Sequence, residues 1–125
     1  MTTNKKLIIF THGTLGKILL ETALLISGES KFNILTISNT GLDLKDAVKL
    51  LDSSFTDDED VIVLTDFPGG SCFMASKIVS KTRKLYTICG VNLSMIISFI
   101  TKQNSYTIDE LNGVIKNDGH RAIDY

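Results

Sequence analysis

The sequence has 125 residues, 43% of them hydrophobic and 22% charged, which fits one globular domain (residues 1–125) with a proper core. Lysine and arginine number 13 and aspartate and glutamate 14, so the chain lacks the basic excess that a nucleic-acid or anionic-membrane surface needs. The longest apolar runs, such as "LSMIISFI", are too short to cross a bilayer.

The N-terminus and the cysteines favour a cytoplasmic protein. The segment "MTTNKK" leads directly into a strand-like run and leaves no room for a signal peptide. Cys72 and Cys89 form neither a CxxC motif nor a Cys/His cluster, which predicts reduced thiols rather than a disulfide framework. No set of metal ligands is evident, so we expect no metal and no other cofactor.

Two kinds of segment alternate along the chain: short runs rich in Ile, Val and Leu, and segments with apolar residues every three or four positions. The first kind predicts strands buried on both faces of a sheet, and the second predicts amphipathic helices. In chain order, they are a strand at 6–10, a helix at 14–27 that Gly28 stops, a strand at 32–37, a helix at 42–54, a strand at 61–65, a helix at 71–84, a strand at 85–89, a helix at 93–102, and a fifth helix around 108–115.

This order predicts an α/β fold: a doubly wound, mainly parallel sheet of four to five strands, flanked by helices on both faces in a single domain. The acidic run 57–60 is interpreted as a solvated loop before the third strand. Lys77, Lys81, Arg83 and Lys84 follow the third helix to its end, where cations suit the helix dipole.

Ligands of such sheets bind at the carboxyl ends of the strands, which places four loops at one edge. They begin at Thr11, Ser38, Asp66 and Gly90. His12 lies in the first loop and Asp66 opens the third, so the two are expected to be neighbours in space.

Together these residues suit the transfer of a phosphoryl group. A neutral imidazole is a nucleophile, and a carboxylate on Nδ1 of His12 would leave Nε2 free to attack. Gly69 and Gly70 allow close approach of an anion, and Ser71 stands at the expected N-cap of the third helix. Gly13, which opens the first helix, offers a second helix N-terminus beside His12.

Other interpretations of the same residues stay open. His12 could be an ordinary loop residue and "DFPGGS" an ordinary helix entry, and His120 in the C-terminal tail is interpreted as a surface residue. A receiver domain would need an acidic pair after the first strand, and a histidine phosphatase would need an arginine at Thr11. Cys72 near a helix N-terminus could be an activated thiol, although a packed thiol fits better.

Three segments together resemble one bacterial family. "IIFTHGTLGKILLETALLISGE", "VIVLTDFPGGSCFMAS" and "ICGVNLSMI" are similar to the signature segments of the mannose/fructose/sorbose-type IIA component of the phosphoenolpyruvate-dependent sugar phosphotransferase system. The resemblance implies a cytoplasmic IIA that accepts a phosphoryl group from phospho-HPr on His12 and delivers it to a IIB component. It also implies indirect association with the membrane subunits IIC and IID, and commonly a homodimer.

The family's histidine-bonding aspartate matches Asp66, and its active-site serine matches Ser71. Cys72 and Ser94 stand where family members often have proline, and Met74 stands where a small polar residue is frequent. These departures leave the sugar and the IIB partner open. The chain ends without a IIB domain, so a free-standing IIA is expected.

Two alternatives within the same chemistry remain. The protein could be a regulatory module whose phosphorylation at His12 is sensed by a partner. It could also be the phosphoryl donor subunit of a dihydroxyacetone kinase, which has a related domain, although "DFPGGS" favours the sugar-transport branch.

Overall fold

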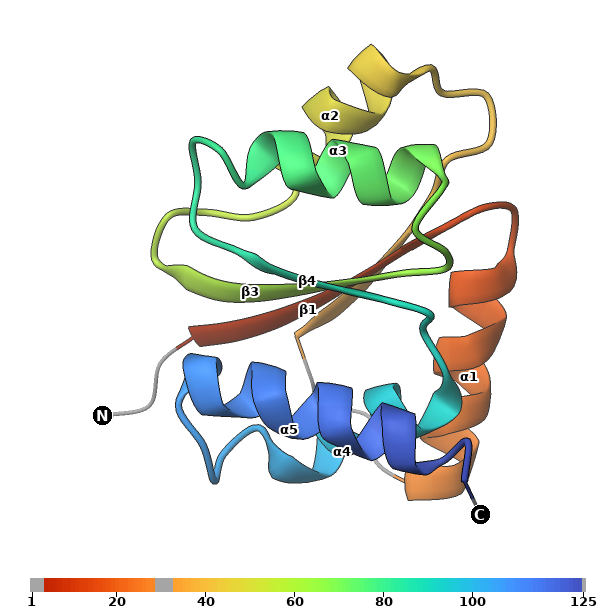
Figure 1. Ribbon diagram of the computed structural model, residues 1–125, viewed down its shortest axis with the longest axis vertical. Coiled ribbons are helices and arrows are strands. Elements are labelled where there is room, and N and C mark those ends of the chain that lie inside the picture. Colours follow the sequence, from red (N-terminus) through yellow and green to blue (C-terminus); the bar gives the residue numbers. More distant parts are fainter. Residues whose placement is uncertain (1–3, 29–32, 125) are drawn as a thin grey trace.

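The computed structural model describes residues 4–28 and 33–124, and in them each of four strands is followed by a helix, with a further helix at the end (Figure 1). The elements are β1 (Asn4–Thr11), α1 (Leu15–Ser27), β2 (Ile34–Ser38), α2 (Leu44–Asp52), β3 (Glu59–Thr65), α3 (Ser71–Val79), β4 (Tyr86–Cys89), α4 (Leu93–Lys102) and α5 (Ile108–Arg121). In this described part of the chain, every helix is too short or too polar to span a membrane.

The four strands form one parallel sheet in the order β2-β1-β3-β4. Strand β1 lies between β2 and β3, with Leu7 opposite both Ile34 and Ile62. Within the described residues, strand β4 pairs with β3 alone. The expected α/β class, parallel sheet and helices on both faces are confirmed, and the described strand count falls within the predicted range.

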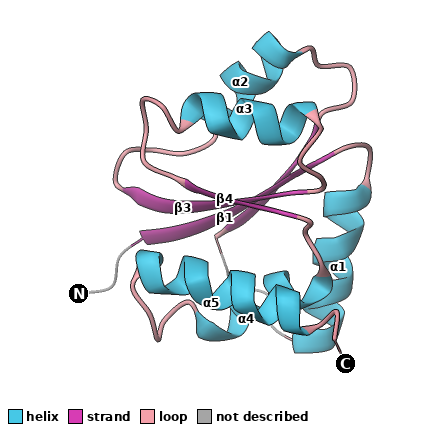
Figure 2. Ribbon diagram, viewed as in Figure 1, coloured by secondary structure: helices cyan, strands magenta, loops and turns pink. Residues whose placement is uncertain are grey.

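The sheet separates two apolar layers, and Figure 2 shows helices above and below the strands. Because successive side chains of a strand point to opposite faces, Leu7 and Ile9 face one layer while Ile8 and Phe10 face the other. Helices α1, α4 and α5 cover the first face and α2 and α3 the second. Strands β1 and β3 are buried on both sides, which explains their continuous apolar runs.

Several predicted boundaries were wrong by a few residues. The third helix ends at Val79 rather than at residue 84, because the amides of Lys81 and Thr82 bond to carbonyls only three residues back and close the chain into turns. The second helix begins at Leu44, where the Asp43 side chain accepts from the Asp46 amide as an N-cap. The second strand begins at Ile34, and Phe32, where we expected it to start, lies outside the described residues.

The acidic run 57–60 is only partly a loop. Glu59 and Asp60 are the first residues of β3, and the Glu59 carboxylate accepts from the Thr56 amide at 3.0 Å and from Asn33 Nδ2 at 2.8 Å. Asp57 stays in the loop, as predicted, but it is paired with Arg83.

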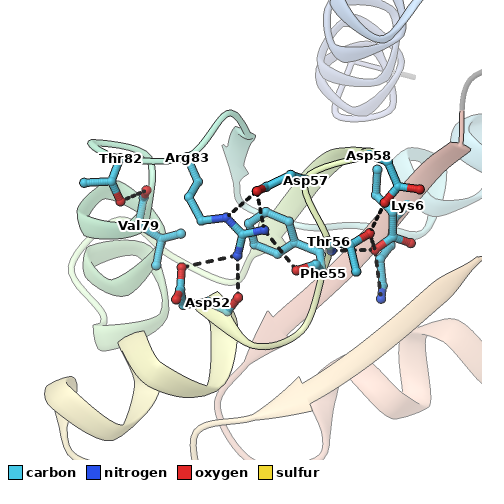
Figure 3. Close-up of polar contacts among 10 residues, drawn as sticks. Lys6, Asp52, Phe55, Thr56, Asp57, Asp58, Val79, Thr82 and Arg83 are labelled. Carbon is cyan, nitrogen blue, oxygen red and sulfur yellow. Dashed lines mark hydrogen bonds and ion pairs between the residues drawn. The ribbon is translucent and has the colours of Figure 1, made fainter.

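Arg83 holds the α2–β3 loop against the end of α3 (Figure 3). Its Nη2 donates to the Phe55 carbonyl at 3.0 Å and pairs with Asp57 at 3.0 Å, while its Nη1 pairs with Asp52 at 3.3 Å. The guanidinium also lies 3.8 Å from the centre of the Phe55 ring. Arg83 is therefore a structural residue that joins two segments of the chain, and not only a cation near the end of a helix.

We expect Arg83→Lys to lower the free energy of unfolding by about 1–3 kcal/mol, because an ammonium cannot serve several separate acceptors and stack on Phe55 at the same time. Urea denaturation measures the change. Lys84→Ala, at an exposed neighbouring position, is the control and should shift stability by less than about 0.5 kcal/mol. Equal unfolding midpoints for Arg83→Lys and wild type would contradict the assigned role.

Candidate active site

The candidate site lies at the carboxyl ends of the two central strands. His12 follows β1 and Asp66 follows β3, and these strands are adjacent in the sheet. The chain leaves β1 through α1 on one face and leaves β3 through α3 on the other, so the two loops diverge here. Such a point is where parallel α/β sheets bind ligands. The expectation that His12 and Asp66 are neighbours in space is confirmed.

Asp66 holds the imidazole of His12 by two contacts. Its Oδ2 lies 2.6 Å from Nδ1 of the ring and accepts from the backbone amide of His12 at 2.9 Å. Its Oδ1 accepts from the Phe67 amide at 3.1 Å. Because an ionised carboxylate can only accept, these contacts place a proton on Nδ1, and in the neutral ring they leave Nε2 as the unprotonated nitrogen.

The Asp66 carboxylate is ionised at neutral pH. Desolvation by partial burial acts to raise the pKa of Asp66. This effect is outweighed by the hydrogen bonds that Asp66 accepts from the backbone and ring of His12 and by its charge interaction with that ring. The pKa of Asp66 therefore lies below its ordinary value. The side chain of Asp66 is 10% exposed, whereas that of His12 is 43% exposed. A shielded negative charge thus supports an imidazole that a partner can reach.

The imidazole packs against the glycine pair and Phe67. A Cβ on Gly70 would lie 2.6 Å from Cε1 of His12, so only glycine leaves room for the ring in this position. The Phe67 ring lies 5.2 Å from the imidazole, centre to centre, with 35° between the planes. Within residues 4–28 and 33–124, Nε2 of His12 has no hydrogen-bond partner. The ring is fixed, and its nucleophilic nitrogen is free.

The N-terminus of α3 lies in the same loop. Gly70 is its N-cap, and Ser71 is the first helical residue, so the expected N-cap at Ser71 was wrong by one position. The first helical hydrogen bond runs from the Met74 amide to the Gly70 carbonyl at 3.2 Å. The amides of Ser71, Cys72 and Phe73 therefore precede the helical bonding pattern, as in anion-binding helix ends.

Asn39 is a residue that sequence reasoning did not single out for the site. Its Nδ2 donates to Oγ of Ser71 at 3.0 Å, so the Ser71 oxygen is oriented and its own proton remains available for donation. Asn39 stands in the loop after β2, which was expected at this edge of the sheet. Its position there, with an amide side chain, was the only indication in the sequence that it belongs to the site. Through Asn39, the end of β2 contacts the start of α3, beside the ends of β1 and β3.

The N-terminus of α1 is less open than predicted. Helix α1 begins at Leu15, and Gly13 lies in the preceding turn with φ +55°, a conformation that favours glycine. The amide of Gly16 is already bonded to the buried Thr11 hydroxyl at 2.8 Å. Gly13 nevertheless adjoins His12, and its backbone is exposed.

Cys72 is a packed residue and not an activated thiol. Its side chain is buried, and desolvation together with the charge of Asp66 raises its pKa to about 12. Atoms of His12, Asp66 and Cys72 lie within 4.8 Å of one another, a grouping that can resemble a metal site. Two observations disfavour metal binding here. The ring and the carboxylate are hydrogen-bonded to each other at 2.6 Å, and the Cys72 thiol keeps its proton, whereas a metal ligand must lose it.

The remaining sequence-predicted residues lie as follows. Met74 is 47% exposed in the first turn of α3. Ser94 lies in the first turn of α4, in a groove of about 500 Å³ between α4 and α5. Gly69 is exposed beside Phe67, and His120 is exposed on α5. Among these, only Gly69 belongs to the loop that contacts His12.

A fixed, half-exposed imidazole with a carboxylate on one nitrogen and free helix amides nearby suits a protein that carries phosphoryl groups. The chain matches the family model of the phosphotransferase system fructose IIA component over residues 6–115. It therefore belongs to this family of sugar phosphotransferase IIA components, and the resemblance drawn from its sequence is confirmed. Membership gives it a general phosphotransfer role in sugar transport and does not favour the dihydroxyacetone-kinase alternative.

Solved structures share this fold. The phosphotransferase system component EIIA from Streptococcus agalactiae is 26% identical, with a TM-score of 0.86 and 94% of each chain covered. The mannose/sorbose-specific IIA subunit from Enterococcus faecalis is 24% identical, with a TM-score of 0.77, and 98% of this chain and 92% of that chain are covered. A search of curated protein sequences found no match.

Proposed function

We propose that this protein relays phosphoryl groups through His12, accepting them from phospho-HPr and passing them to a IIB component. The observation that carries the proposal is the 2.6 Å contact of Nδ1 with Asp66, which leaves Nε2 free on a half-exposed ring. Family membership supports the choice of donor and acceptor. Homodimer formation and indirect association with IIC and IID membrane subunits are parts of the same proposal.

The transfer is an in-line displacement. Nε2 of His12 forms a bond to phosphorus as the bond between phosphorus and the donor breaks, and the donor keeps that electron pair. The proton on Nδ1 stays in the hydrogen bond to Asp66, whose negative charge stabilises the positive ring. In the onward transfer, a nucleophile of IIB forms a bond to phosphorus as the bond between phosphorus and Nε2 breaks. Nε2 keeps that electron pair, and His12 returns to its neutral form.

The incoming phosphoryl oxygens need donors close to His12. Ser71, oriented by Asn39, has a hydroxyl proton to offer, and the α3 amides beside Gly70 add backbone donors. Gly69 and Gly13 complete the proposed phosphate-binding set through their backbone. The protein's contribution is chiefly positioning and charge stabilisation.

We expect the wild-type protein, incubated with phosphoenolpyruvate, enzyme I and HPr, to gain one acid-labile phosphoryl group by intact-mass spectrometry. His12→Ala should gain none. The matched control is His120→Ala, which removes the other histidine and should be phosphorylated like wild type. A phosphate on His12→Ala, or none on wild type, would contradict the proposal.

Onward transfer separates the relay from the regulatory module, which would share the same phosphohistidine. Adding a purified IIB component to the phosphorylated protein should remove its phosphate and label IIB. A phosphate that stays on His12 with each mannose-family IIB tested would favour the regulatory module instead.

A further inference from the structure

Phe67 is the exposed aromatic residue of the site loop. Its side chain is 49% exposed, although it is a large apolar ring without a polar group. Its backbone amide bonds to Oδ1 of Asp66, and its carbonyl accepts from the Gly70 amide at 3.4 Å. The backbone of Phe67 is thereby tied to Asp66 and Gly70, the two residues that contact the His12 ring.

The glycine pair accommodates this ring. A Cβ on Gly69 would lie 3.2 Å from Cε2 of Phe67, and one on Gly70 would lie 3.0 Å from Cε1 and 3.3 Å from Cζ. Neither glycine has a positive φ, so backbone conformation does not require glycine at either position. At Gly70 the requirement is space, which the rings of His12 and Phe67 fill, and at Gly69 a Cβ would press on the Phe67 ring.

These contacts limit the imidazole on three sides. Asp66 bonds to Nδ1, the Gly70 backbone closes the space beside Cε1, and Phe67 lies beside the ring at a tilt of 35°. The covalent bond at Cγ and one hydrogen bond at Nδ1 still allow the ring small rotations about Cβ–Cγ, because a hydrogen bond tolerates a range of angles. The packing of Phe67 on the glycine pair supplies the missing constraint.

We propose that Phe67 is a positioning residue, which holds the His12 ring so that Nε2 meets the incoming phosphorus in line. The assignment rests on the proposed relay function, since it gives Nε2 a reaction to be positioned for. Loss of the ring should slow phosphorylation of His12 about tenfold, because small misplacements of a reacting atom are costly in rate.

Imidazole spectroscopy tests the positioning without any transfer. In full-length protein with ¹⁵N-labelled histidine, only His12 and His120 give ring signals. Wild-type His12 should show one tautomer, protonated on Nδ1. Phe67→Ala should give a mixture of tautomers or broadened signals, Phe67→Leu should restore part of the wild-type pattern, and His120 should not change.

Met74→Ala is the matched control, because it removes an apolar side chain of nearly equal exposure, 47% against 49%, from the same end of α3. It should leave the His12 signals unchanged. Single-turnover phosphorylation by phospho-HPr then gives the rate for each variant, and we expect Phe67→Ala to be slower than Met74→Ala.

Unchanged His12 signals in Phe67→Ala would overturn the inference. A slower rate with unchanged signals would also overturn it, and would assign Phe67 to partner docking. Altered signals in Phe67→Ala, with no phosphate on wild-type His12, would support the positioning of the ring and reject the relay function. The two proposals therefore fail separately.

Discussion

Replacing Gly70 with alanine is expected to slow phosphorylation of His12 about a hundredfold while the fold persists. The added Cβ would lie 2.6 Å from Cε1 of the imidazole, so the ring must move and its contact with Asp66 must change. Gly70 itself has an extended backbone with φ −95°, which alanine adopts without strain. The substitution should therefore change mainly the geometry of the site. The poorer N-cap should lower the free energy of unfolding by about 1 kcal/mol in addition.

Gly113→Ala is the control for this substitution. Gly113 lies inside α5, and a Cβ there would meet nothing within 4 Å, so the change should leave phosphorylation intact and stabilise the helix slightly. Single-turnover transfer from phospho-HPr measures the rates, and urea denaturation measures the stabilities. A wild-type rate for Gly70→Ala would show that the imidazole reacts equally well in another orientation.

Asp66→Asn is expected to slow phosphorylation by about 10²–10³-fold and to lower stability by about 1–3 kcal/mol. Asp66 accepts from three N–H groups with two oxygens: the amide and ring of His12, and the amide of Phe67. An asparagine has one such oxygen, so in either orientation its NH₂ group would face another donor. It would also remove the charge that stabilises the phosphorylated ring.

The stability part of this effect should depend on pH. The folded-state pKa of Asp66 is lowered from 3.8, so its ionisation stabilises the fold above that pH, and the stabilisation is lost as pH falls through the lower, folded value. The difference in free energy of unfolding between wild type and Asp66→Asn should shrink as the pH falls below about 3.8. A difference that keeps its size below this pH would contradict an ionised Asp66.

Much of this site follows from the sequence because topology alone brings it together. The alternation of apolar runs and helical segments predicted the parallel sheet, and the parallel sheet placed the loops of His12 and Asp66 at one edge. The glycine pair has a second role that the sequence did not indicate. Its space is filled by Phe67 and His12, a packing detail that no periodicity carries.

Other features depend on individual hydrogen bonds. The pairing of Asn39 with Ser71 joins loops that are 32 residues apart, and nothing in either loop specifies the partner. The end of α3 at Val79 depends on short-range turns, and apolar spacing does not indicate where these replace helical bonds. Arg83 looked like a cation at a helix end, but its partners lie at the end of α2 and in the loop that follows it.

The order of the strands has a consequence for the durability of the site. His12 and Asp66 continue β1 and β3, so the distance between their backbones is inherited from adjacent inner strands, about 4.8 Å apart, and not from the loops. In hydrogen-exchange experiments, central strands such as β1 and β3 are among the last parts of a domain to unfold locally, whereas edge strands such as β2 and β4 unfold more readily. Local unfolding of an edge strand therefore leaves His12 and Asp66 at the same distance from each other.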